Sequence, residues 1–411
     1  MARLTFDELG GAPAGLRDFH QAVARRAFVG VRRGVGAAAR PAEFVHDAVA
    51  DGVYTALRSA TRLLAGGVDL TLRHAHVERA PLSSSPHGSR LLGALQGLRG
   101  DALEREGSPL AQPMAVRVAG CPVPPEPEAL ADAFPVATPQ VVVFLHGLME
   151  TEHSWRLGGI PTYGERLTED LGATPVYVRY NSGRHVSENG RSLSELLGAL
   201  VAAWPVAVDE IALIGHSMGG LVARSGCFYA AEEEAEWVGR VRHVVSLGTP
   251  HMGAPLEQAV HYASAALHAV PETRPVARFL RRRSAGIRDL RRGTLVDEDW
   301  RDRDPDALRA AACREVPLLE GATHCFVTAT ITGSPRHPVG RLVGDFLVLV
   351  PSASGRSRAR RIPFRAEDGL HVGGVHHFAL LNHPAIYAKL CDWLASASAP
   401  GRSLGGTARG A

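Results

Sequence analysis

Short apolar runs alternate with helix-length segments through the middle of the chain. Five of the runs have the length and composition of buried strands, and a shorter one follows them. These runs are residues 140–145, 174–178, 210–214, 241–247, 324–331 and 362–365. Helical patterns separate the first four, at residues 163–171, 192–204 and 220–231. Because helix-length crossovers join parallel strands, the pattern predicts an α/β fold with a mostly parallel central sheet flanked by helices.

The regions outside these runs show helical periodicity or long intervals without strand-like runs. Residues 16–67 carry helical periodicity and predict two amphipathic helices, and a further helix is predicted at 90–105. Residues 253–321 are too long for a simple crossover, so we expect a cap over the C-terminal edge of the sheet. The predicted division is an N-terminal helical region at 1–110, an α/β domain at 111–396 and a flexible tail at 397–411. The α/β domain includes a Pro-rich linker at 121–127 and the cap at about 254–320.

The composition is that of a soluble globular protein, with 45% hydrophobic and 21% charged residues. The net charge is +3 and no aromatic residues accompany the basic clusters, so nucleic acid is not an expected partner. No apolar stretch approaches the ~18 residues of a membrane span, and no signal-peptide pattern is evident, which predicts a cytoplasmic protein. The arginines of the first helix suit a solvated face better than an anionic membrane, although peripheral membrane contact stays open.

The cysteines are scattered and show no C-x-x-C spacing. They are Cys121, Cys227, Cys313, Cys325 and Cys391. Such a distribution predicts neither a disulfide framework nor a zinc site, and we expect no metal or cofactor.

The most specific motif is Gly215-His216-Ser217-Met218-Gly219. It lies between an apolar run and a helical segment, which is the strand, sharp turn and helix of a nucleophile elbow. Glycines on both sides of the turn expose the Ser217 hydroxyl and aim the Met218 N–H at a bound carbonyl. The same spacing recurs at residues 401–405, where neither strand nor helix flanks it, so we interpret that copy as a chance match.

A second backbone donor is predicted in the loop after the first strong strand. That strand ends in His146-Gly147-Leu148, and Gly147 lets the backbone come close to a substrate. The Leu148 N–H would therefore complete an oxyanion hole with Met218. His146 and His216 are favoured as packing residues that support the site, because a base must lie across the site from the elbow.

The general base is expected in a loop after the last strand, in the chain order Ser, acid, His. Residues 373–384 hold three histidines. His377 is preferred because the Phe-Ala-Leu-Leu segment behind it would anchor its ring, and His376 is the alternative base or a supporting residue. His383 precedes a proline at a predicted helix start, and His371 lies upstream; both remain weaker alternatives.

Asp345 is the predicted acid of the triad. It follows a strand-like run and a turn, and it is the only acid between Glu320 and Glu367. It would hold the tautomer of the base and stabilise the imidazolium without itself taking the proton. The other acids belong to a charged run that we interpret as a solvated cap surface: Asp297, Asp299, Asp302, Asp304 and Asp306.

Together these motifs resemble the α/β-hydrolase serine lipases and esterases. More narrowly, they resemble bacterial members related to the glycosylphosphatidylinositol inositol-deacylase-type, triacylglycerol lipase-like enzymes. The resemblance covers about residues 141–394 and rests on the elbow, the His146-Gly147 strand end, Gly344-Asp345, the His377-Phe-Ala-Leu-Leu ending and Gly248-Thr249-Pro250-His251-Met252-Gly253. In such enzymes the last segment lines the site, which implies supporting roles for Thr249 and His251; a purely conformational turn is the alternative. Where these enzymes often have Asp-Gly-x-Val, this chain reads Gly-Asp-Phe-Leu.

The sequence predicts a carboxylic-ester hydrolase, an esterase or lipase, that forms an acyl-enzyme on Ser217. Apolar residues of the expected cap indicate a lipid or medium-chain ester: Ala265, Leu267, Val270, Phe279 and Leu280. An acyltransferase or a thioesterase would use the same triad. The third interpretation is a non-catalytic protein that acts through the N-terminal helices, and the ordered Ser, Asp and His argue against it.

Overall fold

A computed structural model describes residues 82–255, 257–258, 261, 283–305, 307, 312–334, 336–357 and 360–395 of the chain. The helices predicted within 16–67, the apolar cap residues between 265 and 280, and the tail at 397–411 lie outside these described residues. Residues 81–411 form one compact unit.

Eight strands form one sheet in the order β2-β1-β4-β3-β5-β6-β7-β8. All neighbours from β4 through β3 to β8 pair in parallel, whereas β1 pairs antiparallel with both β2 and β4. The strands are β1 Ala115–Val118, β2 Cys121–Val123, β3 Gln140–Leu145, β4 Thr174–Arg179, β5 Glu210–His216, β6 Val241–Leu247, β7 Thr323–Thr330 and β8 Gly369–Gly373.

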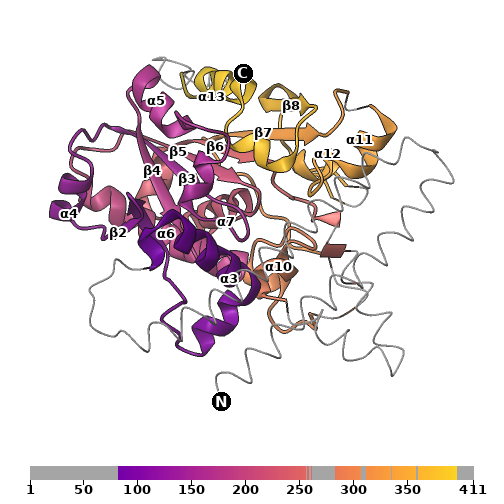
Figure 1. Cartoon of the computed structure of the whole chain (residues 1–411), viewed down its shortest axis with the longest axis horizontal. Helices are drawn as coiled ribbons and strands as arrows, with labels where there is room; N and C mark the ends of the chain where they lie inside the picture. Colours follow the sequence, from indigo (N-terminus) through magenta and orange to yellow (C-terminus); the bar gives the residue numbers. More distant parts are fainter. Residues whose placement is uncertain are drawn as a thin grey trace, which may run out of the picture. The chain divides into compact units, whose positions relative to one another are not determined.

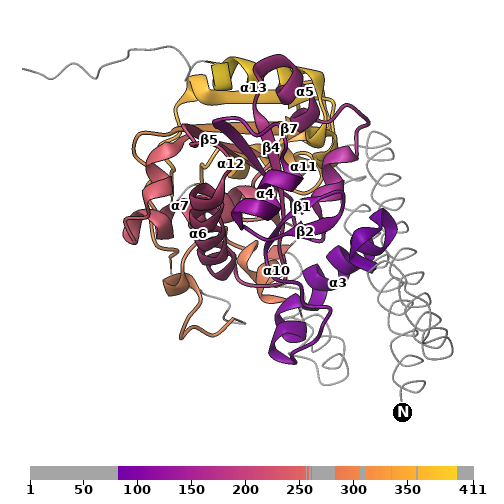
Figure 2. The same ribbon diagram turned by 90° about the vertical axis from the view of Figure 1, so that its left-hand side faces the viewer.

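Helices cover both faces of this sheet (Figures 1 and 2). The α-helices of the described residues are α3 Pro86–Arg105, α4 Pro127–Ala133, α5 Tyr163–Leu171, α6 Val186–Ala203, α7 Met218–Glu232, α10 Ala285–Asp289, α11 Pro338–Val343, α12 Val350–Ala353 and α13 Pro384–Ala395. The strands and helices of the central region alternate as predicted. The bounds of β3, β6 and α5 are the predicted ones, whereas α6 begins at Val186 instead of residue 192.

Alternation along the strands divides the core into two layers. In β3, Val141 and Val143 belong to the buried cluster that includes α6 and α7, while Val142 and Phe144 belong to the cluster that includes α5 and α13. Successive side chains of a strand point to opposite faces, so a central strand that is apolar throughout fits between two helical layers.

Two sequence predictions about strands are wrong. Residues 362–365 form no strand, and the last strand is β8, at Gly369–Gly373. Ile362 and Phe364 are apolar because they pack against Phe326, whereas β8 is defined by its pairing with β7 and carries a weak apolar signal. The segment interpreted as a Pro-rich linker contains β2, whose pairing with β1 tolerates Pro122 at the edge of the sheet.

Helix α3 packs closely on the loop that follows β3. Its first turn is capped by Ser85, whose hydroxyl accepts the Gly88 N–H, and Pro86 occupies the first helical position. A methyl group added at Gly97 would lie 2.9 Å from Met149 N, and one added at Gly93 would lie 2.8 Å from Glu150 O. Only glycine allows this approach, so the described end of the predicted N-terminal region contacts the α/β domain.

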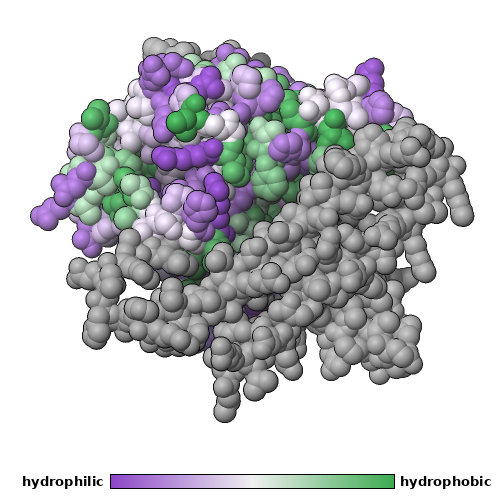
Figure 3. Space-filling view, viewed as in Figure 1, coloured by the Kyte–Doolittle hydropathy of each residue, from purple (hydrophilic) through white to green (hydrophobic). Residues whose placement is uncertain are grey.

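The predicted fold class is confirmed by this topology. A mostly parallel eight-stranded sheet lies between helical layers, as in the α/β-hydrolase fold. None of the helices in the described part of the chain is long and apolar enough to cross a membrane. Hydrophilic and hydrophobic residues are interspersed over the described part of the face in Figure 3.

Candidate active site

Ser217 occupies a sharp turn between the end of β5 and the start of α7. Its φ of +52° and ψ of −120° lie in a region that residues other than glycine rarely adopt. A methyl group added at Gly215 would lie 2.3 Å from Gly220 N, and one added at Gly219 would lie 2.3 Å from Leu145 O. The Ser217 N–H donates to Leu247 O of the neighbouring strand at 2.8 Å, and the residue is half-buried. The local geometry is that of the predicted elbow.

His377 and Asp345 form a buried pair at the same edge of the sheet. His377 Nδ1 lies 2.7 Å from Asp345 Oδ2, and the two residues are 2% and 1% exposed. The other carboxylate oxygen, Oδ1, accepts the N–H groups of Leu347 and Val348 at 3.0 and 2.8 Å. Asp345 is therefore held as a hydrogen-bond acceptor in a fixed orientation.

The backbone around Asp345 explains why this loop is tight. Asp345 lies between α11 and α12, after Gly344 at φ +64°. A methyl group at Gly344 would lie 2.0 Å from Val348 O, and the next residue, Phe346, has φ +86°. These strained positions turn the chain so that the Asp345 carboxylate faces His377.

The electrostatics of the pair separate the roles of its two members. Burial alone would raise the pKa of Asp345, but the neighbouring His377 and the two backbone N–H groups lower it below its ordinary value. Burial alone would lower the pKa of His377, but the charge and hydrogen bond of Asp345 raise it above its ordinary value. Nδ1 therefore carries the proton that Asp345 accepts, which leaves Nε2 as the basic nitrogen.

His377 Nε2 is buried and has no hydrogen-bond partner among the described residues. The ring lies against the end of β6, because a methyl group at Gly248 would lie 3.0 Å from His377 Cε1. The ring centroid is also 4.7 Å from that of His216, the residue before Ser217. The ring that carries this nitrogen thus lies beside His216, at the end of β5.

The other histidines and acids considered from sequence have different partners. His376 is exposed, His371 contacts the hydroxyls of Thr328 and Thr330 at 2.9 and 3.2 Å, and His383 accepts the Ala385 N–H. Asp297 accepts from Arg191 and Arg301, and Asp299 accepts the N–H groups of Leu295 and Arg314. The structure brings none of these together with Ser217, and Asp306 lies outside the described residues.

The two predicted backbone donors are Met218, which directly follows Ser217, and Leu148, in the loop after β3. A methyl group at Gly147 would lie 3.1 Å from Ser217 Cβ, so the loop after β3 approaches the elbow directly. Met218 is the first residue of α7, where helix geometry leaves N–H groups unpaired. Neither the Leu148 nor the Met218 N–H donates to another backbone carbonyl in the part of the chain that the structure describes, apart from bonds within elements.

His146 packs against Tyr180 and the backbone of the loop after β3. It is fully buried, its Nε2 accepts the Tyr180 N–H at 3.2 Å, and its Nδ1 therefore donates to Gly147 O at 2.8 Å. Its ring stacks on Tyr180 with centroids 4.2 Å apart. These contacts fix the start of the loop that holds Leu148.

Thr249 and His251 are buried behind the elbow. A methyl group at Gly220 would lie 2.1 Å from Thr249 Oγ1, so Thr249 packs on the first turn of α7. Both ring nitrogens of His251 lack a hydrogen-bond partner among the described residues, and its ring is 5.0 Å from that of Phe364. The segment therefore supports the elbow, and the structure does not bring it to the Ser217 hydroxyl.

Sequence reasoning missed Glu150. This glutamate is 8% exposed and accepts the Gly147 N–H at 2.8 Å, and its carboxylate also contacts His216. Its signal in the sequence is an acid that directly follows the apolar pair Leu148-Met149, but its partner His216 is distant in the chain.

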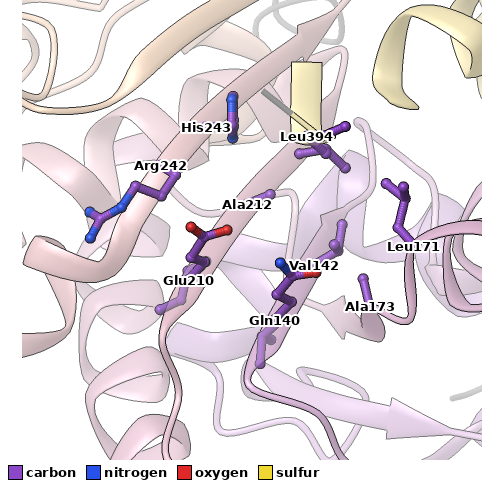
Figure 4. A pocket seen from close by; sticks show the side chains of 12 residues that line it. Gln140, Val142, Leu171, Ala173, Glu210, Ala212, Arg242, His243 and Leu394 are labelled. Carbon is purple, nitrogen blue, oxygen red and sulfur yellow. The ribbon is translucent and has the colours of Figure 1, made fainter. Parts of the chain in front are cut away.

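A cavity of about 220 Å³ lies away from Ser217, at the N-terminal ends of strands β3 and β5 (Figure 4). Its lining includes Gln140 and Glu210, the first residues of β3 and β5, whereas Ser217 follows the last residue of β5. Among the described residues, no group of three or more His, Cys, Asp or Glu side chains is arranged to hold a metal ion.

Comparisons with known proteins agree with the predicted fold class. Residues 138–302 match the model of the PGAP1-like alpha/beta domain. A comparison with curated protein sequences gives no significant match.

Similar solved structures include two esterases and a lipase. The lipase BlEst2 of Bacillus licheniformis in its mature form is 17% identical, with a TM-score of 0.40, and the match covers 62% of this chain and 91% of that chain. The carboxylesterase EstE1 from a metagenomic library is 14% identical, with a TM-score of 0.37, over 77% of this chain and 98% of that chain. The esterase of the archaeon Pyrobaculum calidifontis is 15% identical, with a TM-score of 0.36, over 63% of this chain and 76% of that chain.

The matched residues include β3, the loop after it, the elbow and β6, whereas Asp345 and His377 lie beyond them. The family model confirms the predicted resemblance, because residues 138–302 are similar to the PGAP1-like alpha/beta domain.

Proposed function

We propose that this protein is a serine hydrolase that cleaves carboxylic esters. The observation that carries the proposal is the buried Asp345–His377 pair, whose Nε2 has no partner among the described residues and whose ring lies beside that of His216, the residue before the elbow serine. A nucleophile, a base, an acid that orients the base and two backbone donors are the parts that acyl transfer requires.

In the proposed mechanism, Ser217 Oγ attacks the ester carbonyl carbon while His377 Nε2 takes the hydroxyl proton. The carbonyl oxygen becomes an oxyanion that the Leu148 and Met218 N–H groups stabilise. His377 then gives its proton to the leaving alcohol, and the acyl group stays on Ser217. Water attacks this acyl-enzyme with His377 again as base, which releases the acid and restores Ser217. Asp345 remains ionised throughout and holds the His377 tautomer.

The proposed substrates are lipid or medium-chain esters. Phe378 follows His377 directly and is 42% exposed, so an apolar surface lies beside the base. Such a surface favours an apolar acyl or alcohol group over a charged one.

A panel of nitrophenyl esters from acetyl to palmitoyl tests this function. We expect hydrolysis that is lost in Ser217→Ala and that is faster for medium or long chains than for acetate. Equal rates along the panel would contradict the apolar substrate, and hydrolysis unchanged in Ser217→Ala would contradict the mechanism. A thioester substrate and an added alcohol acceptor, measured in parallel, distinguish ester hydrolysis from thioesterase and acyltransferase activity.

A further inference from the structure

Glu150 and His216 form a second buried acid–histidine pair beside Ser217. His216 Nδ1 lies 3.0 Å from Glu150 Oε1 and 3.1 Å from Oε2, and the two side chains are 0% and 7% exposed. Oε2 also accepts the Gly147 N–H at 2.8 Å. Burial of a carboxylate is costly unless it is paired, so this arrangement needs a reason that the proposed mechanism does not supply.

The second nitrogen of His216 faces the main chain of His377. His216 Nε2 lies 3.3 Å from His377 O. A carbonyl oxygen can only accept a hydrogen bond, and an ionised carboxylate can only accept as well. Both ring nitrogens of His216 therefore face acceptors.

These contacts form one chain of hydrogen bonds across the site. It runs from the Gly147 N–H to Glu150, from Glu150 to His216, and from His216 to the backbone of His377. Ser217 lies beside this chain, because the methyl position at Gly147 is 3.0 Å from Glu150 Oε1 and 3.1 Å from Ser217 Cβ. These hydrogen bonds thus join the loop that holds Leu148, one of the two proposed oxyanion donors, to the main chain of the proposed base.

We propose that Glu150 is a positioning residue, which through His216 holds the oxyanion loop and the main chain of His377 in place on either side of Ser217. The inference rests on the proposed ester hydrolysis, since positions matter here only if Ser217 reacts. Displacements of about 1 Å in such a site reduce turnover by roughly 100-fold.

Charged and titratable groups around the pair are consistent with this role. His216, His146 and Tyr180 face Glu150, and Asp345 faces His377 from the other side. Burial alone would raise the pKa of Glu150, but His216 and the Gly147 N–H lower it below its ordinary value. The Glu150 carboxylate is thus held as an acceptor for Gly147.

Glu150→Gln tests the inference, because it keeps the shape of the side chain and removes the carboxylate. We expect kcat for a short-chain nitrophenyl ester to fall by ~10- to 100-fold. KM should change by less than about twofold, because the substrate-binding surface is unchanged. The matched control is Glu165→Gln, since Glu165 Oε2 accepts the Thr162 N–H at 2.7 Å at the start of α5 in the same way. The control should keep the wild-type kcat.

His216→Asn interrupts the same series of hydrogen bonds between Glu150 and His377. Because both substitutions interrupt the same series of hydrogen bonds, kcat of the double variant should fall no further than kcat of the more impaired single variant. An unchanged kcat in Glu150→Gln, or losses that multiply in the double variant, would overturn the inference. It is also overturned if both single variants fail to fold, since the pair would then serve stability alone.

Wild-type activity separates this inference from the function on which it rests. A wild type that hydrolyses no ester overturns the proposed function, and this inference with it. An active wild type with a fully active Glu150→Gln variant overturns this inference alone.

Discussion

Ser217 adopts a backbone conformation that a serine rarely takes, and the residues around it are buried polar groups. A backbone conformation of this kind costs about 1–3 kcal/mol and persists where the surrounding structure determines it. Here that structure consists of Gly215 and Gly219, which leave space for the turn, and of the backbone N–H groups that fix Asp345. The proposed reactivity of Ser217 therefore depends on a few residues that have fixed partners.

Asp345→Asn should reduce kcat by about four orders of magnitude with the fold intact. An amide presents an N–H where Nδ1 of His377 needs an acceptor, which favours the wrong tautomer. Steady-state kinetics give kcat, and thermal unfolding confirms the fold. Near-normal turnover would move the role of the acid to another residue.

The pH dependence of kcat/KM follows from the raised pKa of His377. Only the neutral ring accepts a proton, and Asp345 stabilises the charged ring against the opposing effect of burial. Activity should therefore fall as pH is lowered through a midpoint above ~6.5, the ordinary histidine value. A pH–rate profile measures this midpoint. A midpoint below 6.5 would show that burial outweighs Asp345.

At the scale of elements, packing between glycines and neighbouring backbone sets the position of the loop after β3. Helix α3 approaches Met149 through Gly97, and the hydroxyl of Ser284, which caps α10, donates to Gly97 O at 2.6 Å. The piece of the predicted cap that contains α10 therefore meets α3 near the proposed oxyanion loop.

Gly97→Ala tests this packing. Alanine favours a helix over glycine by ~1 kcal/mol, but a methyl 2.9 Å from Met149 N overpacks the contact at a cost of ~1–3 kcal/mol. We expect a net loss of stability in denaturant unfolding together with a lower kcat. Gly239→Ala is the control, because a methyl group there meets open space. A Gly97→Ala variant at least as stable as wild type, with unchanged kcat, would contradict the packing argument.

Elements were predictable from sequence where their own residues determine them. β3 is a nearly continuous apolar run because helices cover both faces, and α5 carries the capping box of Thr162 and Glu165. β1, β2 and β8 are short and are formed by pairing with neighbours, so local pattern does not reveal them. Ser217, Asp345 and His377 were predicted from motif order and stay a prediction as a triad. The Glu150–His216 contact joins residues far apart in the chain, so motif order does not reveal it.

At the scale of the whole molecule, a buried ion pair ties the start of the described chain to the sheet. Arg179 of β4 pairs with Glu152, and its guanidinium also donates to Ser83 O at 2.9 Å and Ser89 Oγ at 2.8 Å. Arg179 is 1% exposed, so loss of these acceptors would leave a buried donor unsatisfied. Residues 81–411, which form one compact unit, keep all of them.

Two truncations test this dependence. A chain that begins at residue 81 should hydrolyse esters at a rate similar to wild type, because every contact of Arg179 remains. A chain that begins at residue 111 lacks α3, Ser83 and Ser89, and should unfold at lower temperature and lose activity. Equal stability of the two truncated chains would show that the α/β domain does not need α3.

Labelling with a fluorophosphonate probe, followed by peptide mass mapping, tests the central proposal most directly. The probe reacts covalently with a serine that a neighbouring histidine activates. The account predicts one label on Ser217 in wild type, and none in Ser217→Ala. An unlabelled wild type, or equal labelling of Ser217→Ala, would contradict it.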